Sequence, residues 1–213
     1  KGFPGNVYDK LKDADPNVFD VEAAQKLLAE AGYPGGEGFP KYELWIRSPQ
    51  PYMVTLCEAV QAVWKEHLNI DVDLYPTDHQ SFTASVFSEK KIPMYFVGYS
   101  RDYFDPSTFL AVFRSGGRHP HDDSAFDEAY AAANAEFDAN KRLELLGQSE
   151  EILVNSGAYA FLIQPFSISL WPCNLAGEGI EPNAEGYQAD GGYGAAWPWA
   201  GSYWSDSNCR DGL

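Results

Sequence analysis

Asp102 lies between two tyrosines, Tyr99 and Tyr103, in a stretch that could bind a cationic group. A short apolar run over residues 92–97 predicts a buried strand before it, and residues 107–113 predict a helix after it. α/β proteins bind ligands where a strand ends and a helix begins, because polar groups gather in the crevice beyond the carboxyl ends of the strands. An aspartate at this place can face a ligand's cation, with the two tyrosine rings as flat apolar walls.

Two other interpretations of Asp102 stay open at this point. Asp102 could only cap or solvate a loop, which is an ordinary use of aspartate in turns. Asp102 and Asp105 could also form a carboxylate pair of the kind that glycosidases use. Asp105 has a simpler use, because it is placed to cap the helix that Pro106 begins. We therefore do not expect an enzyme, and we expect no catalytic residue.

Two other patterns suggest metal ligands, and each has a simpler interpretation. His119 and His121 flank Pro120, but the sequence does not fix the further ligands that a zinc site needs, so a polar loop is favoured. Asp71 and Asp73 alternate with apolar residues, which is typical of the solvent-facing side of an edge strand. We expect neither a metal site nor a cofactor.

The composition limits the partners of this chain. Its 213 residues carry a formal net charge of −16, which argues against nucleic acid and against an anionic membrane surface. A hydrophobic content of 45% is enough for a proper core. No apolar run reaches the roughly 18 residues that span a bilayer, and the first residues do not resemble a signal peptide. We expect either a cytosolic protein or one whose export signal lies further upstream.

The three cysteines show no spacing typical of a zinc site. Cys57 lies on the apolar stripe of a predicted helix and is expected to be a buried small hydrophobe. Cys173 and Cys209 bracket a tail rich in glycine and aromatic residues, with no helical or strand period. Whether these two cysteines form a disulfide that closes the tail is left open by the sequence.

Helices and strands are predicted to alternate over the first half of the chain, which favours an α/β layer with parallel strands. A capped helix over residues 21–31 is followed by a strand over 42–46, a helix from Pro51, a strand over 70–75, a helix after Asp78 and the strand over 92–97. The second half predicts a helix that Ser124 begins in a capping box, a longer helix after Asp138, and one or two buried strands over residues 158–171.

Several motifs follow one another between residues 18 and 175. Residues 19–33 form a capped helix that ends at Gly-Tyr, and residues 63–72 carry a helix that ends in Leu-Asn-Ile-Asp-Val. Residues 98–103 read Gly-Tyr-Ser-Arg-Asp-Tyr, and residues 124–127 read Ser-Ala-Phe-Asp. In this order they resemble the C-terminal lobe of the family 5 extracellular solute-binding proteins, the receptors of peptide and oligopeptide ABC transporters. The family usually has a glycine at the position of Asn69.

The resemblance implies a periplasmic-binding-protein-like α/β lobe with a mixed, mostly parallel sheet flanked by helices. Residues 1–175 would form the second lobe of a two-lobed receptor, and residues 176–213 would return towards the first lobe. In peptide-binding members the aspartate of the turn pairs with the ligand's α-amino group, a role that falls here to Asp102. Tyr99 replaces the pocket-lining tryptophan of the family, and Phe96 stands where some members carry an arginine for ligand carboxylates.

The function that this resemblance implies is the binding of peptides or oligopeptides for import. The receptor would close around its ligand and deliver it to the membrane permease of an ABC transporter. It would act as a monomer outside the cytoplasm, in the periplasm or lipid-anchored at the cell surface, with no nucleic-acid partner. An oligosaccharide receptor of the same family is the alternative, and a hydrolase acting on glycans is a more distant one.

Overall fold

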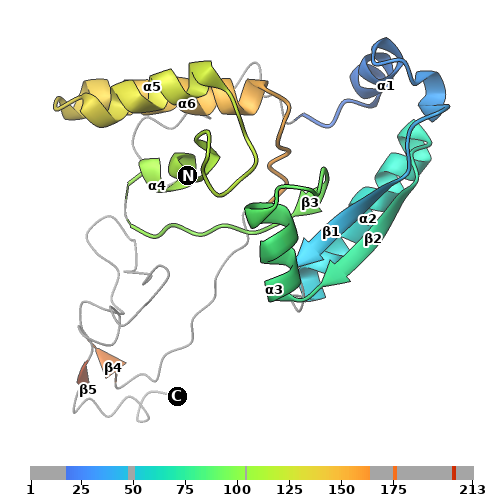
Figure 1. Ribbon diagram of the computed structural model, residues 1–213, viewed down its shortest axis with the longest axis horizontal. Helices are drawn as coiled ribbons and strands as arrows, with labels where there is room; N and C mark the ends of the chain where they lie inside the picture. Colours follow the sequence, from blue (N-terminus) through green and yellow to red (C-terminus); the bar gives the residue numbers. More distant parts are fainter. Residues whose placement is uncertain (1–17, 48–50, 104, 164–174, 177–202, 205–213) are drawn as a thin grey trace, which may run out of the picture. The chain divides into compact units, whose positions relative to one another are not determined.

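The computed structural model describes residues 18–47, 51–103, 105–163, 175–176 and 203–204 (Figure 1). The chain divides into two compact units, one of Lys1–Tyr99 with Phe109–Ala160, the other of Ser100–Thr108 with Phe161–Leu213. Cys173 and Cys209 lie outside the described residues, as does most of the predicted tail. Two short strands of the second unit, β4 (Leu175–Ala176) and β5 (Tyr203–Trp204), pair in antiparallel orientation.

The first unit contains a parallel sheet, as the alternation of helices and strands predicted. Its strands are β1 (Tyr42–Arg47), β2 (Val72–Thr77) and β3 (Tyr95–Phe96), in the spatial order β2-β1-β3. Both neighbours of β1 run parallel to it. The strand predicted over residues 92–97 is shorter than expected, because Pro93 has no N–H to extend the ladder. The predicted α/β class is confirmed.

Helix α2 (Pro51–Leu68) covers the sheet with the apolar stripe that its spacing predicted (Figure 1). Leu44 and Ile46 of β1 point into the same core as Met53 and Cys57 of α2, and all four are buried. Strict alternation in β1 and helical spacing in α2 thus place their apolar side chains on facing surfaces. The sequence-based placement of Cys57 in a core is confirmed.

The burial of Cys57 predicts an inert thiol. Only 1% of its surface is exposed, and burial raises the pKa of the thiol to about 11, so the reactive thiolate is rare at neutral pH. We expect Cys57 in the native protein to react with a thiol reagent such as DTNB only as fast as the protein opens. Mild denaturant should accelerate the reaction strongly, whereas fast labelling of native Cys57 would contradict the described core.

Helix starts follow the aspartates that the sequence marked. Asp20 accepts a hydrogen bond from the N–H of Ala23 at the start of α1 (Val21–Glu30), and Asp138 accepts one from Lys141 at the start of α6 (Ala139–Asn155). Asp78 likewise caps α3 (His79–Phe82), which continues as the π-helix η3 (Thr83–Ser88). These caps confirm the predicted helix starts.

The start of α5 (Ser124–Ala135) differs from the prediction. Its N-cap is Asp123, whose carboxylate accepts hydrogen bonds from the N–H groups of Ala125 and Phe126. A capping box led by Ser124 would need Asp127 to reach back to the helix start. Asp127 instead accepts a hydrogen bond from the N–H of Ser115, which ties the preceding loop to the helix and lowers the pKa of the Asp127 carboxyl.

Helices α5 and α6 lie side by side around a second core (Figure 1). Phe126 and Tyr130 of α5 pack there with Leu146 and Leu153 of α6. After α6 the strand predicted from residue 158 is absent from the described residues 158–163, in which three consecutive apolar side chains from Phe161 onward are exposed. The prediction was wrong there because an apolar run alone does not supply a neighbouring strand to pair with.

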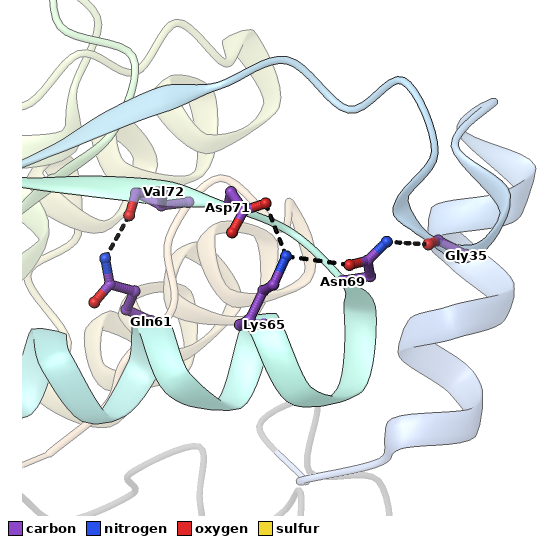
Figure 2. Close-up of polar contacts among 6 residues, drawn as sticks. All are labelled: Gly35, Gln61, Lys65, Asn69, Asp71 and Val72. Carbon is purple, nitrogen blue, oxygen red and sulfur yellow. Dashed lines mark hydrogen bonds and ion pairs between the residues drawn. The ribbon is translucent and has the colours of Figure 1, made fainter.

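The connection from α2 to β2 is fixed by polar contacts, which Figure 2 shows. Asn69 has a left-handed backbone with φ 53°, and its side-chain amide donates to the carbonyl of Gly35. Lys65 donates both to the side chain of Asn69, at 3.2 Å, and to Asp71, at 2.8 Å. Asparagine tolerates this backbone conformation better than other residues with a side chain, which explains why it can stand at a glycine position.

Within the described residues, none of the helices combines the length and the apolar composition that crossing a membrane requires.

Candidate functional site

The turn that carries Asp102 begins at the carboxyl end of β3. The chain passes from β1 to β2 on one side and then crosses to β3 on the other side of β1. The strand order therefore reverses between β1 and β3, and the crevice beyond such a reversal is where open α/β sheets bind their ligands. Residues 97–103 follow β3 in the chain, and the sequence predicted the binding turn there.

Two side chains of the second unit hold the turn in shape. The N–H of Asp102 donates to the hydroxyl of Thr108 at 3.0 Å, and the N–H of Ser107 donates to the carboxylate of Asp105 at 2.9 Å. Thr108 and Ser107 are buried, whereas Asp102 is exposed. Asp105 is thus the helix cap that the sequence predicted, which leaves the glycosidase-like pair with Asp102 unsupported.

Tyr103 lies in the same unit as Asp102. Its hydroxyl is 3.1 Å from the hydroxyl of Ser107, and half of its surface is exposed. The helix that follows is short, because α4 (Ser107–Leu110) tightens into the 3₁₀-helix η4 (Ala111–Phe113). The role of Tyr103 as an apolar wall stays a prediction, and a half-exposed ring is compatible with it.

Tyr99 belongs to the first unit and is half-buried. Its ring makes edge contacts with Phe109 and His119, at centroid distances of 6.1 and 6.3 Å. The guanidinium carbon of Arg118 lies 5.9 Å from the same ring. Aromatic and cationic neighbours thus fix the orientation of Tyr99.

The sequence suggested that His119 and His121 lie in a polar loop, and this prediction was wrong. Both imidazoles are buried among aromatic rings, with His119 stacked on Phe113 at a centroid distance of 4.9 Å. The Nε2 atom of His121 is buried without a hydrogen-bond partner among the described residues. Within the same part of the chain no group of three or more potential metal ligands occurs. His119 packs against Tyr99, and His121 packs against the rings of Phe126 and Tyr159, roles that the sequence pattern did not indicate.

The polar atoms of this cluster form a short chain of hydrogen bonds. The Tyr95 hydroxyl lies 3.4 Å from Nδ1 of His119 and 3.2 Å from the hydroxyl of Tyr159, which donates to the carbonyl of Pro120. Burial, with a contribution from the charge of Arg118, lowers the pKa of His119 to about 4. Burial also raises the pKa of both tyrosines above the ordinary value. The side chains of Tyr95, His119 and Tyr159 are therefore uncharged at neutral pH.

Asp71 and Asp73 face solvent, as their alternation predicted. Asp71 pairs with Lys65 and Asp73 with Lys41, each at 2.8 Å, and all four side chains are more than half exposed. Pairs of this kind contribute little to stability, because water screens them. The two aspartates thus have ordinary surface partners.

Arg118 is the residue of this region that sequence reasoning missed. Its guanidinium carbon lies 4.5 Å from the centre of the Phe87 ring, in addition to its position near Tyr99. Phe87 is contributed by η3, far away in the sequence. The sequence signal for Arg118 is its place directly before His119-Pro120-His121.

Comparison with known proteins agrees with this architecture. A family model described as bacterial extracellular solute-binding proteins, family 5 Middle, matches residues 1–120. The oligopeptide-binding protein OppA of Bacillus subtilis (strain 168) is 28% identical over 159 residues, which are 73% of this chain and 29% of that protein. A dipeptide-binding protein of Pseudomonas aeruginosa is 27% identical over 176 residues, or 76% of this chain and 32% of that protein. The chain spans less than a third of the length of these curated relatives.

Solved structures show the same relationship. A periplasmic oligopeptide-binding protein of Borrelia burgdorferi, OppAIV, is 34% identical with a TM-score of 0.59, over 64% of this chain and 28% of that one. The murein tripeptide binding protein MppA of Escherichia coli is 26% identical with a TM-score of 0.60, over 66% of this chain and 28% of that one. With the family model matching more than half of the sequence, this chain belongs to the bacterial extracellular solute-binding proteins of family 5.

Proposed function

We propose that this chain is the second lobe of a two-lobed receptor that binds peptides outside the cytoplasm for import by an ABC transporter. The position of the Asp102 turn carries the proposal, because it starts at the reversal point of the sheet where α/β proteins bind ligands. The names of the related proteins, which bind oligopeptides or dipeptides, support the same ligand class. In this proposal residues 176–213 return towards the first lobe.

Asp102 is the proposed partner of the ligand's α-amino group, with Tyr99 and Tyr103 as apolar walls. A charge-assisted hydrogen bond between a carboxylate and an ammonium is roughly twice as strong as a neutral one, and it strengthens further when lobe closure removes water. Thr108 and Asp105 hold the turn through hydrogen bonds that do not need the Asp102 side chain.

Binding in this receptor requires no chemical step. A ligand that contacts both lobes stabilises the closed state by its differential affinity for that state, and the closed state is what a permease can recognise. We therefore propose a carrier without catalytic activity, with a membrane permease as its partner and a monomeric state.

The test measures peptide binding by the full-length receptor that contains this chain. Calorimetry would compare wild type with Asp102→Asn, using short alanine peptides with free or acetylated N-termini. We expect Asp102→Asn to weaken binding of free peptides at least about tenfold, the low end of what a hydrogen bond to a charged group contributes. Acetylation should weaken binding to wild type by a similar factor and add little in the variant, because both changes remove the same interaction.

Asp122→Asn is the matched control, because it removes an equal charge from an exposed position outside the turn. It should bind every peptide as wild type does. Oligosaccharides serve as a separate probe of the alternative ligand class. If they stabilise the receptor and free peptides do not, the assignment of peptides, and with it the role of Asp102, is wrong.

A further inference from the structure

Arg118 is an exposed cation held in place by aromatic rings of the first unit. Its guanidinium carbon lies 4.5 Å from the ring centre of Phe87 and 5.9 Å from that of Tyr99. A guanidinium over an aromatic ring uses its flat face for that contact, so the N–H donors in its plane stay available for an anion. Phe87 of η3 and Tyr99 of the segment after β3 thus hold an anion-binding group next to a proposed wall of the peptide site.

The backbone on both sides of Arg118 is fixed as well. The N–H of His119 donates to the carbonyl of Val112 at 2.8 Å, and the His119 ring is buried. At Gly117 a Cβ atom would lie only 2.7 Å from the carbonyl oxygen of Arg114 and 2.8 Å from that of Val112. Only glycine fits at this close approach, so the backbone next to Arg118 has a well-defined conformation. A fixed donor loses less entropy on binding than a mobile one.

The charges around Arg118 leave its own charge uncompensated within the part of the chain that the structure describes. Among those residues no carboxylate lies within ion-pair distance of its guanidinium, although the chain as a whole has a net charge of −16. His119 beside it is neutral, and its other neighbours are the aromatic rings of Phe87 and Tyr99. A cation with no carboxylate beside it among the described residues is suited to an anion from outside.

We propose that Arg118 binds a carboxylate of the ligand beside Tyr99, and that the receptor therefore prefers peptides that present a carboxylate there. This proposal rests on the proposed peptide function. The carboxylate is either the peptide's C-terminus or an acidic side chain, which share the planar geometry that a guanidinium binds with two parallel hydrogen bonds.

The experiment uses the full-length receptor and an alanine peptide series with free N-termini. The series contains the free acid, its C-terminal amide, and an amide in which one internal alanine is replaced by glutamate. Calorimetry on wild type, Arg118→Gln and Arg118→Lys gives the affinity for each peptide. Arg114→Gln is the matched control, because Arg114 is an exposed arginine of the same loop.

For wild type we expect the free acid to bind at least about tenfold more tightly than the plain amide, as a charge-assisted contact predicts. If the glutamate amide binds as tightly as the free acid, Arg118 binds an acidic side chain of the peptide. If it binds only as weakly as the plain amide, Arg118 binds the C-terminal carboxylate. Arg118→Gln should abolish the preference for a carboxylate. Arg118→Lys should keep part of it, because the charge remains without the planar pair of donors.

The outcomes separate this proposal from the function on which it rests. If wild type binds the peptides and Arg118→Gln keeps the full preference for a carboxylate, only the role of Arg118 is overturned. If wild type binds none of the peptides, the peptide function fails and the role of Arg118 fails with it. A general loosening of the loop would weaken acid and amide equally, so the ratio of the two affinities reports the contact itself.

Discussion

Gly36→Ala is expected to destabilise the protein by about 3 kcal/mol or more, because it combines backbone strain with a steric clash. Gly36 has φ 78°, a conformation that residues with a side chain rarely adopt. An added Cβ would clash with the carbonyl oxygen of Leu68 and lie 2.8 Å from that of Asn69. Both atoms belong to the backbone at the end of α2, which cannot move without disturbing the contacts of Figure 2.

Gly35→Ala is the matched control for this prediction. Gly35 has a similar φ of 64°, but nothing lies within 4 Å of an added Cβ. The free energy of unfolding of this variant should therefore fall only by the cost of the left-handed backbone conformation, about 1 to 2 kcal/mol. The free energies of unfolding come from urea denaturation followed by circular dichroism. Equal losses in the two variants would mean that the close approach of Gly36 to the end of α2 is absent.

The local elements of the first unit could be predicted because short-range rules decide them. An aspartate before an apolar stripe defines the start of α1, α3 and α6, and strict alternation defines β1. The alternation of helices and strands then leaves a parallel sheet as the simplest arrangement. Asp105 shows the same rule at the site, since its capping role followed from its place before Pro106.

The surroundings of Tyr99 could not be predicted, because they depend on contacts between distant parts of the sequence. Arg118 contacts the Phe87 ring of η3. His119 contacts the rings of Tyr95 in β3 and of Tyr159 beyond α6. A histidine pair around a proline looks polar in the sequence, and only these distant rings make it a core. The predicted capping box at the start of α5 was wrong for a related reason. Asp127 accepts a hydrogen bond from Ser115 in the preceding loop and not from the start of its own helix.

The buried state of His119 predicts that the protein loses stability on mild acidification. The ordinary pKa of a histidine is 6.5, whereas burial lowers that of His119 to about 4 in the folded protein. Between these values the unfolded chain binds a proton that the folded protein does not, so stability rises with pH across this range. The contribution of neutral His119 is complete above pH 6.5 and is lost as the pH falls towards 4. From pH 7.5 to 4.5 this loss is about 2 to 3 kcal/mol.

None of the groups that face His119 among the described residues would stabilise its protonated form, so the loss of stability is not offset. Tyr95 and Tyr159 are neutral at these pH values, and the charge of Arg118 opposes a second cation beside it. Protonated His119 would therefore be a buried charge among rings, with no carboxylate among the described residues to balance it. Ordinary carboxylates lose their own contributions only at lower pH, since their pKa values are near 4.

The variant that isolates this effect is His119→Phe, which keeps an aromatic ring in the cluster and removes the titrating group. Urea denaturation at pH 7.5 and 4.5 gives its free energy of unfolding relative to wild type. We expect the variant to lose about 2 to 3 kcal/mol less than wild type on acidification, whatever its stability at pH 7.5. His79→Phe, which removes an exposed histidine of α3, is the matched control variant. If wild type and His119→Phe lose the same free energy of unfolding on acidification, His119 is accessible to protons in the folded protein. The burial of His119 among aromatic rings would then be wrong.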